Sequence, residues 1–156
     1  MSITACTDPI ETWDEWPADT AVVIGCSDAK ADEATTVDDL YRSSFFALAL
    51  KAARALVPDE QIRVLSARHG LVALDEIIDP YDTRWGDDDA IDTDDLAAQL
   101  GWLAATHSVV VSMTAKAYTG RIGASIDVVD VFDGNRGIGD HRHDLSAAAR
   151  LVDATR

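Results

Sequence analysis

Two short valine-rich runs, at 20–27 and 108–114, limit the folds open to this chain more than any other feature. Their sequences, "TAVVIGCS" and "SVVVSMT", place three or more apolar residues in a row without alternating polar positions. A strand that is apolar on both faces is typical of the interior of a parallel sheet covered by helices on both sides. We therefore expect both runs to be central strands of such a sheet.

Two further runs and four expected helices complete an alternating pattern. "QIRVLSA" (61–67) and "DVVDVFD" (127–133) predict strands, because they are rich in Val and Ile. The expected helices lie at 38–57, 92–107, about 115–123 and about 140–153. Strands that alternate with helices in this way favour an α/β fold with right-handed crossovers.

The pattern predicts one α/β domain over residues 20–156, preceded by an acidic arm at 1–19. We expect a three-layer, Rossmann-like arrangement, with a mostly parallel sheet of four or five strands and helices on both faces. The four runs should neighbour one another in the order 2-1-3-4, which leaves a crevice between the first and third runs. In the arm, Trp13 and Trp16 are expected to pack on the domain.

The net negative charge of the chain limits the kinds of molecule that it can bind. The chain has 28 acidic residues, 23 of them Asp, against 13 basic ones, for a formal net charge of -15. Such a surface repels phosphate backbones and disfavours duplex tracking, and it suits either a high-salt protein or an ordinary acidic one. The chain shows no signal peptide, no apolar run of about 20 residues and no disulfide framework, so we expect a cytoplasmic protein without membrane contact.

Polar residues gather where the predicted strands end. In a parallel sheet these ends share one edge, which is the usual place for a ligand. The residues at the four ends are Cys26, Ser27, Asp28 and Lys30; Ser66, Arg68, His69 and Gly70; Ser112, Thr114 and Lys116; and Asp133, Asn135, Arg136 and the glycines 134, 137 and 139. The sequence therefore predicts a strand-end cleft, bordered by the long connection at 68–91, since long ordered loops are usually functional.

Each chemically active residue also has a plain structural interpretation. Cys26 is either a nucleophile or a small buried apolar residue. Lys30 is either an electrostatic or amine catalyst, or a solvated loop lysine. His69 is either a general acid/base, for which its ordinary pKa is suited, or a residue of a turn before Gly70.

Two later motifs carry weaker signals. "GNRGIG" (134–139) is either a glycine turn or an anion site before a helix, and it does not match the G-x-G-x-x-G fingerprint of dinucleotide sites. "HRHD" (141–144) places two histidines at i and i+2, on different faces of a helix, with no third ligand cluster. We therefore expect no metal and no cofactor.

Four segments carry a resemblance to a known family. "CSDAK", "LYRSSFFALAL", "VLSARHGLVALDEIIDPYD" and "GIG" resemble a family of small bacterial, archaeal and phage domains of unknown function, over about residues 21–145. A looser similarity links the chain to the Pro-Cys-Ser-x-x-Lys domain of archaeosine synthase and to YaaA-type peroxide-stress proteins, although Gly25 stands where archaeosine synthase has proline. The resemblance implies nucleobase metabolism, including 7-deazaguanine modification, on a Rossmann-like sheet similar to that of uracil-DNA glycosylases.

The resemblance also singles out residues. It implies that Lys30 faces the same pocket as Cys26. It places Tyr41 and Ser43 in the first turn of the next helix, near the positive end of that helix. It also places Tyr81 where its ring can stack on a base. The positions that match the shared pattern are Cys26, Ser27, Lys30, Tyr41, Ser43, Ser66, His69, Gly70, Pro80 and Tyr81.

Our first hypothesis is an enzyme that modifies a nucleobase or nucleotide, with Lys30, His69 and Cys26 as catalytic residues. The expected substrate contacts are Ser27, Tyr41, Ser43, Ser66, Arg68, Gly70, Tyr81 and Gly137. The alternatives are a non-catalytic base-sensing module and an acidic protein that mimics nucleic acid, the second of which fits the polar edge poorly. The expected ligand is a free base, a nucleotide or a flipped-out nucleotide of a single strand, with or without a partner subunit.

The charge generates a first prediction. The melting temperature should rise between about 0.1 M and 1 M salt, because the Debye length falls from about 10 Å to about 3 Å and repulsion among the acidic groups is screened. Thermal unfolding followed by circular dichroism across that range measures the effect. A flat or falling melting temperature would exclude adaptation to high salt.

Overall fold

The computed structural model describes residues 17–131. Several sequence predictions lie outside these residues: the arm tryptophans Trp13 and Trp16, the glycine segment with Gly137, the "HRHD" motif and the last expected helix. Residues 17–131 hold the central strands, three of the four expected helices and most of the predicted site.

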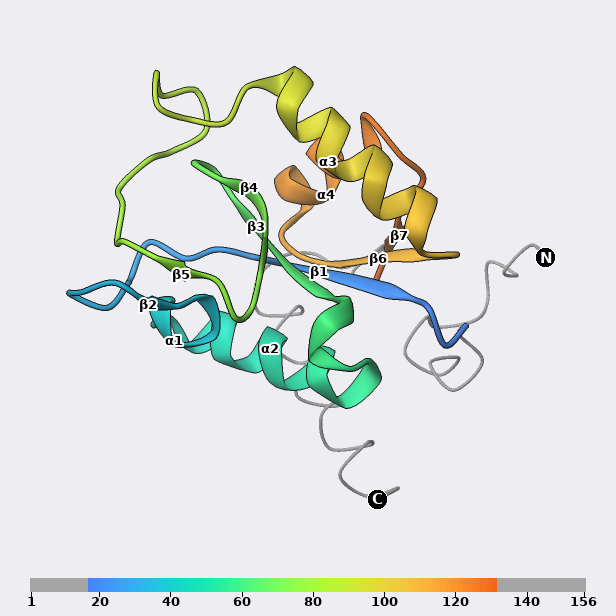
Figure 1. Ribbon diagram of the computed structural model, residues 1–156, viewed down its shortest axis with the longest axis horizontal. Helices are drawn as coiled ribbons and strands as arrows, with labels where there is room; N and C mark the ends of the chain where they lie inside the picture. Colours follow the sequence, from blue (N-terminus) through green and yellow to red (C-terminus); the bar gives the residue numbers. More distant parts are fainter. Residues whose placement is uncertain (1–16, 132–156) are drawn as a thin grey trace.

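A five-stranded sheet forms the centre of the domain, in the order β4-β3-β1-β6-β7 (Figure 1). Four strands are parallel: β1 (Ala21–Gly25), β3 (Ile62–Ser66), β6 (Val110–Met113) and β7 (Val129–Asp130). They correspond to the first, second, third and fourth predicted runs. The expected α/β class and mostly parallel sheet are confirmed, with β1 and β6 in the interior of the sheet.

The fifth strand, β4 (Gly70–Ala73), pairs antiparallel with β3 and makes the sheet mixed. The sequence predicted a long connection over 68–91, because Pro80 and Gly86 interrupt any regular pattern there. Two N–H groups of β4 bond to side chains instead of a strand: Leu71 donates to Gln99 Oε1 at 2.7 Å, and Ala73 donates to Glu76 Oε1 at 3.2 Å. A separate small sheet joins β2 (Thr35–Thr36) to β5 (Ile77–Ile78).

Helices cover both faces of the sheet (Figure 1). Alternate residues of β1 point to opposite faces, as strand geometry requires. Val22 and Ile24 pack in the core that includes Phe46 of α2 (Ser44–Leu56), whereas Val23 packs with Leu100 of α3 (Thr93–Thr106). A short α4 (Lys116–Gly123) adds Ile122 to the second core. Each fully buried aliphatic side chain contributes about 1.5–3 kcal/mol, so both layers stabilise the sheet.

The single helix expected over 38–57 is instead two helices, α1 (Val37–Leu40) and α2, separated by extended backbone at Tyr41 and Ser43. Tyr41 pairs with Lys30 in an antiparallel bridge, which holds this backbone out of helical geometry. Ser43 Oγ then accepts the Phe46 N–H at 3.0 Å and caps α2. Tyr41 and Ser43 therefore precede α2, and their expected place in its first turn is wrong.

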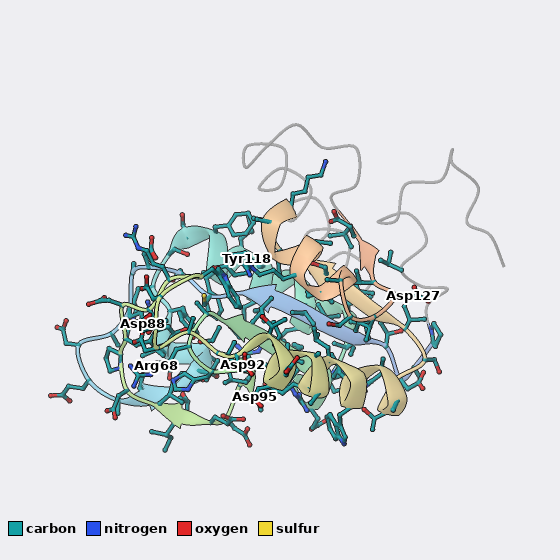
Figure 2. The ribbon with its side chains drawn as sticks, turned by 90° about the horizontal axis from the view of Figure 1, so that it is seen from above. Arg68, Asp88, Asp92, Asp95, Tyr118 and Asp127 are labelled. Carbon is teal, nitrogen blue, oxygen red and sulfur yellow. The ribbon has the colours of Figure 1, made fainter. Side chains whose placement is uncertain are left out.

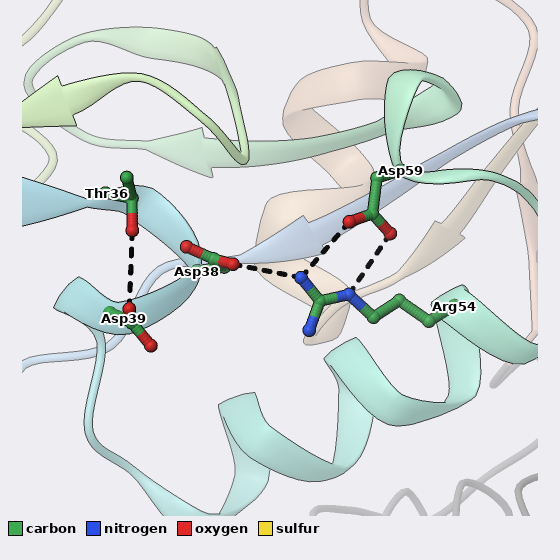
Figure 3. Close-up of polar contacts among 5 residues, drawn as sticks. All are labelled: Thr36, Asp38, Asp39, Arg54 and Asp59. Atoms are coloured by element: carbon green, nitrogen blue, oxygen red, sulfur yellow. Dashed lines mark hydrogen bonds and ion pairs between the residues drawn. The ribbon is translucent and has the colours of Figure 1, made fainter.

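An exposed ion cluster ties α2 to its neighbours (Figure 3). The Arg54 guanidinium bonds to Asp38 of α1 at 3.0 Å and to both carboxylate oxygens of Asp59, at 3.1 and 3.2 Å, in the 3-10 helix η2 (Asp59–Gln61). Exposed ion pairs contribute little individually, about 0–1 kcal/mol. The cluster therefore aligns α1, α2 and the start of β3 more than it stabilises them.

The helices expected at 92–107 and about 115–123 agree closely with the structure. α3 begins after Asp92, with Asp94 and Asp95 near its positive end, and α4 lies within the expected 115–123. Across residues 17–131, the helices are too short or too polar to cross a bilayer.

Two glycines give a matched test of the fold. Gly70 has a φ of +73°, and a Cβ there would collide with Gln99 Oε1 and Ile91 Cδ1, whereas Gly101 lies in α3 with open space beside it. Gly70→Ala should lower the free energy of unfolding by at least about 1–2 kcal/mol. Gly101→Ala should raise it by about 0.5–1 kcal/mol. Urea unfolding measures both, and equal effects would show that the Gly70 turn is not constrained.

Candidate functional site

Several predicted site residues from separate segments meet beyond the ends of β1 and β3. They are Lys30, Tyr41, Ser66, His69 and Tyr81, with Cys26 beside them. Figure 2 shows Arg68 and Asp88 at this end of the domain and Asp127 at the opposite end. The expected convergence of these side chains is therefore present in the structure.

A chain of hydroxyl groups lies at the centre of the cluster. Ser66 Oγ lies 2.6 Å from Tyr81 Oη, which lies 2.6 Å from Tyr41 Oη. Ser66 Oγ also accepts the backbone N–H groups of Arg68, at 3.2 Å, and His69, at 3.1 Å. Because these N–H groups occupy the lone pairs of Ser66, its hydroxyl donates to Tyr81.

The three hydroxyl groups form one compact cluster. If every group donates in the same direction, Ser66 donates to Tyr81 and Tyr81 donates to Tyr41. Hydrogen bonds aligned in this way strengthen one another. Ser66 also acts directly on Tyr41, because its hydroxyl lowers the pKa of that tyrosine against the larger effect of burial.

Both tyrosines are buried, with 4% of Tyr41 and 6% of Tyr81 exposed. Burial raises the pKa of Tyr41 to about 12 and the pKa of Tyr81 further, so both keep their hydrogens at neutral pH. A buried ring with a bonded hydroxyl is not available as a stacking surface. The expected stacking of a base on Tyr81 is therefore inconsistent with its burial. Tyr81 instead contacts Lys30 through its ring, and Ser66 and Tyr41 through its hydroxyl group.

Lys30 lies over the buried rings. Its ammonium is 4.5 Å from the ring centre of Tyr81 and 5.9 Å from that of Tyr41, at distances typical of cation–π contacts. Its hydrogen bond, to the carbonyl of Asp28, is long at 3.4 Å. Within residues 17–131, Lys30 forms no ion pair. Aromatic faces contact the charge, and none of the described carboxylates pairs with it.

His69 also packs against Tyr81, with the ring centres 5.4 Å apart and the planes nearly perpendicular. Burial lowers the pKa of His69 below its ordinary value, and Arg68 lowers it further, while Glu76 acts in the opposite direction. The ring is therefore neutral at pH 7, and it can both accept and donate a proton. Such a ring beside a lysine is compatible with acid/base chemistry.

Cys26 connects this cluster to a second group of aromatic residues. Its Sγ lies 3.4 Å from Tyr118 Oη, on α4. The Tyr118 ring covers the end of β1, where a Cβ at Gly25 would lie 3.4 Å from it, in ordinary van der Waals contact. The Trp85 ring meets Tyr118 edge to face at 5.8 Å, and the Arg121 guanidinium lies 4.3 Å from the Trp85 ring.

Sequence reasoning missed Tyr118 and Trp85. Burial raises the pKa of Tyr118, and Cys26 raises it further, while the Trp85 indole acts as a nearby donor in the opposite direction. Within residues 17–131, the buried Trp85 Nε1 makes no hydrogen bond of normal geometry, and the acceptor on which it acts is the Tyr118 hydroxyl. Two features could have indicated them. Tyr118 lies in α4, which starts at the end of β6, and Trp85 lies in the long connection at 68–91.

The remaining predicted residues have structural partners. Ser43 caps α2, Ser27 Oγ donates to the Ala29 carbonyl at 2.8 Å, and Arg68 lies 3.6 Å from Asp89. Gly70 serves the turn into β4. At the end of β6, three hydroxyl groups bond within 2.7–3.1 Å of one another: Ser112, Thr114 and Thr119.

Open grooves of about 710, 410 and 350 Å³ lie elsewhere on the domain. The largest lies beside the start of β6 and the segment from Gly123 to Val129, at the opposite end of the sheet. None of these three grooves includes a predicted site residue. Among the residues described, no three His, Cys, Asp or Glu side chains converge as metal ligands.

A family model covers this arrangement. The model of a family of unknown function (DUF6884) matches residues 21–124, from β1 through α4. The chain belongs to this family. The expected resemblance to an uncharacterised domain family is thereby confirmed, and the matched segment spans every residue of the strand-end cluster. Neither the curated proteins nor the solved structures gave a match. The comparisons therefore give no support to the expected similarity to archaeosine synthase and YaaA-type proteins.

The hydroxyl chain predicts unequal effects for two conservative changes. Tyr81→Phe removes the middle of the chain and leaves both Ser66 and Tyr41 without their partner, so it should cost about 1–3 kcal/mol of stability. Tyr41→Phe removes only the end and should cost less, about 0.5–1.5 kcal/mol. Urea unfolding of both variants compares them. A larger loss for Tyr41→Phe would show that the chain runs in another direction.

Proposed function

We propose that the strand-end cluster binds a nucleobase or nucleotide and that the protein modifies it. The observation that carries the proposal is the Lys30 ammonium, which lies over two buried tyrosines and has no carboxylate partner among residues 17–131. A cation held in this way beside a neutral imidazole and a thiol suits a polar planar ligand better than it suits a structural role. We also propose that the α/β fold is Rossmann-like.

The proposed roles follow from position and chemistry. Lys30 stabilises negative charge that develops on a ring oxygen or nitrogen. His69 transfers a proton, because its ring is neutral at pH 7. Cys26 is half-buried at the end of β1 and is the candidate nucleophile. A link to 7-deazaguanine-type modification is supported by the "CSDAK" motif alone.

A non-catalytic base-binding module is the second candidate. The observation in its favour is that the polar groups are already paired with one another: Cys26 with Tyr118, and Tyr81 with Ser66 and Tyr41. Such pairing suits a rigid recognition surface as well as it suits catalysis. Turnover of a bound base distinguishes the two candidates.

Local charge restricts the form of the ligand. The net charge of -15 opposes a long phosphate backbone, while Lys30 and the exposed Arg42, Arg68 and Arg84 lie in the segments that border the cluster. A small basic region of this kind suits one nucleotide or a flipped-out nucleotide of a single strand. Duplex tracking requires a continuous basic stripe.

Substitution of Lys30 tests the proposal. Lys30→Ala should weaken binding of bases or nucleotides by at least about tenfold, because a charged hydrogen-bond donor is lost. Its melting temperature should change little, since a lysine without an ion pair contributes little to folding. Lys51→Ala, on the exposed surface of α2, is the control. Isothermal titration calorimetry and thermal unfolding measure the two properties.

Three results would contradict the proposal. The first is that the wild-type protein binds no base or nucleotide. The second is a large loss of stability in Lys30→Ala, which would make Lys30 structural. The third is tight, steeply salt-dependent binding of duplex DNA, which would indicate a DNA-binding protein instead.

A further inference from the structure

Cys26, the candidate nucleophile, has three tyrosines around it, and one of them contacts its sulfur. Cys26 Sγ lies 3.4 Å from Tyr118 Oη, within hydrogen-bond distance for sulfur. Charge on Cys26 also raises the pKa of Tyr41 and of Tyr81, but the hydroxyl groups of these two bond to each other, and that of Tyr81 to Ser66. Among the described tyrosines, Tyr118 is therefore the one placed to bond directly to the sulfur.

Contacts on several sides fix the place of Tyr118. Its ring covers the end of β1 at Gly25, and the Trp85 ring meets it edge to face at 5.8 Å. Its neighbour in α4, Thr119, bonds through Oγ1 to Ser112 Oγ at 2.7 Å, on β6. The packing of the domain therefore holds the Tyr118 hydroxyl group beside Cys26, as a precise site requires.

The direction of the bond follows from the chemistry of the reactive form of cysteine. The thiolate is the nucleophile, and it carries no hydrogen, so it can only accept. Tyr118 keeps its hydrogen at neutral pH, because burial raises its pKa and charge on Cys26 raises it further. The indole N–H of Trp85, which is a donor only, acts on the same hydroxyl oxygen. The hydrogen of Tyr118 is thus left for the sulfur.

We propose that Tyr118 is a positioning residue, whose hydroxyl group donates a hydrogen bond to the Cys26 thiolate and holds the sulfur at the end of β1. This inference rests on the proposed function, in which Cys26 is the candidate nucleophile, and adds a residue to that site. A donor to the sulfur increases the fraction of thiolate at neutral pH, while each thiolate attacks less readily. Tyr118 therefore speeds the reaction of the sulfur at neutral pH, and not at a pH where every thiol is ionised.

Other ionisable groups near Cys26 stay the same when the Tyr118 hydroxyl is removed. They are the buried Tyr41 and Tyr81, Lys30 over their rings, His69 against Tyr81, Asp28 in the loop after β1, and Arg121 beside Trp85. Tyr118→Phe deletes one oxygen atom and keeps the ring. A change in the pH profile of Cys26 in this variant therefore reports on the hydroxyl group.

Alkylation by iodoacetamide, in which the thiolate displaces iodide, measures this profile in the full chain. Tyr118→Phe should slow alkylation of Cys26 at pH 7 by about three- to tenfold, because a hydrogen bond to a charged group is lost and nucleophilicity offsets only part of that loss. At about pH 10, where thiols are ionised, the variant should react at least as fast as the wild type. Peptide mass spectrometry follows Cys26 separately from Cys6, whose rate should be equal in both proteins.

Two further variants complete the test. Trp85→Phe keeps the Tyr118 hydroxyl and removes the N–H that acts on it, so the profile should change in the same direction by a smaller factor. This variant decides the question if Tyr118→Phe does not fold, which thermal unfolding checks. Trp102→Phe changes a tryptophan that is 58% exposed on α3 and should leave the profile unchanged.

The outcomes separate this inference from the proposed function. Equal rates for Tyr118→Phe and the wild type at pH 7 overturn the positioning role. So does a rate that changes by the same factor at both pH values, because Tyr118 would then only control access to the sulfur. Either result leaves base binding at Lys30 in place. Failure of the wild-type protein to bind a base or nucleotide overturns the proposed function, while the pH profile still decides the role of Tyr118.

Discussion

The strand β1 has no face left for solvent. Ala21 through Ile24 are fully buried, and the backbone pairs with β3 on one side and β6 on the other. A strand confined in this way requires helices on both faces, which α2 and α3 supply. The chain regains access to solvent just past Gly25. The candidate site begins there, because the first polar positions after a buried strand fall at the edge where other strands also end.

The core and the candidate site share residues. Tyr41 and Tyr81 belong to the same buried cluster as Ile24 and Phe46, yet their hydroxyl groups form the chain beneath Lys30. A buried polar chain is tolerated because backbone N–H groups after β3 satisfy Ser66 at its start. Changes at these tyrosines are therefore expected to affect stability as well as the proposed binding, whereas changes at Lys30 are expected to separate the two.

Sequence reasoning found the strands because burial on both faces leaves a direct mark, the unbroken valine runs of β1 and β6. It found Lys30, Ser66, His69 and Tyr81 as neighbours because parallel strand ends must meet. It missed the break before α2, since the Lys30–Tyr41 bridge is a tertiary contact that overrides helical spacing. It also missed Trp85 and Tyr118, because no local pattern indicates which side chains from distant segments will approach a cysteine. Ser43 and Gly70 matched a motif, yet each has a backbone role in the structure.

The bonds from Gln99 and Glu76 to β4 have a consequence for how molecules of this protein meet one another. An edge strand normally offers a row of free N–H groups, onto which a strand of another molecule can add. On β4, the N–H groups of Leu71 and Ala73 are already occupied by side chains of the same molecule. An incoming strand would have to displace both, so this border of the sheet resists the edge-to-edge pairing that starts aggregation.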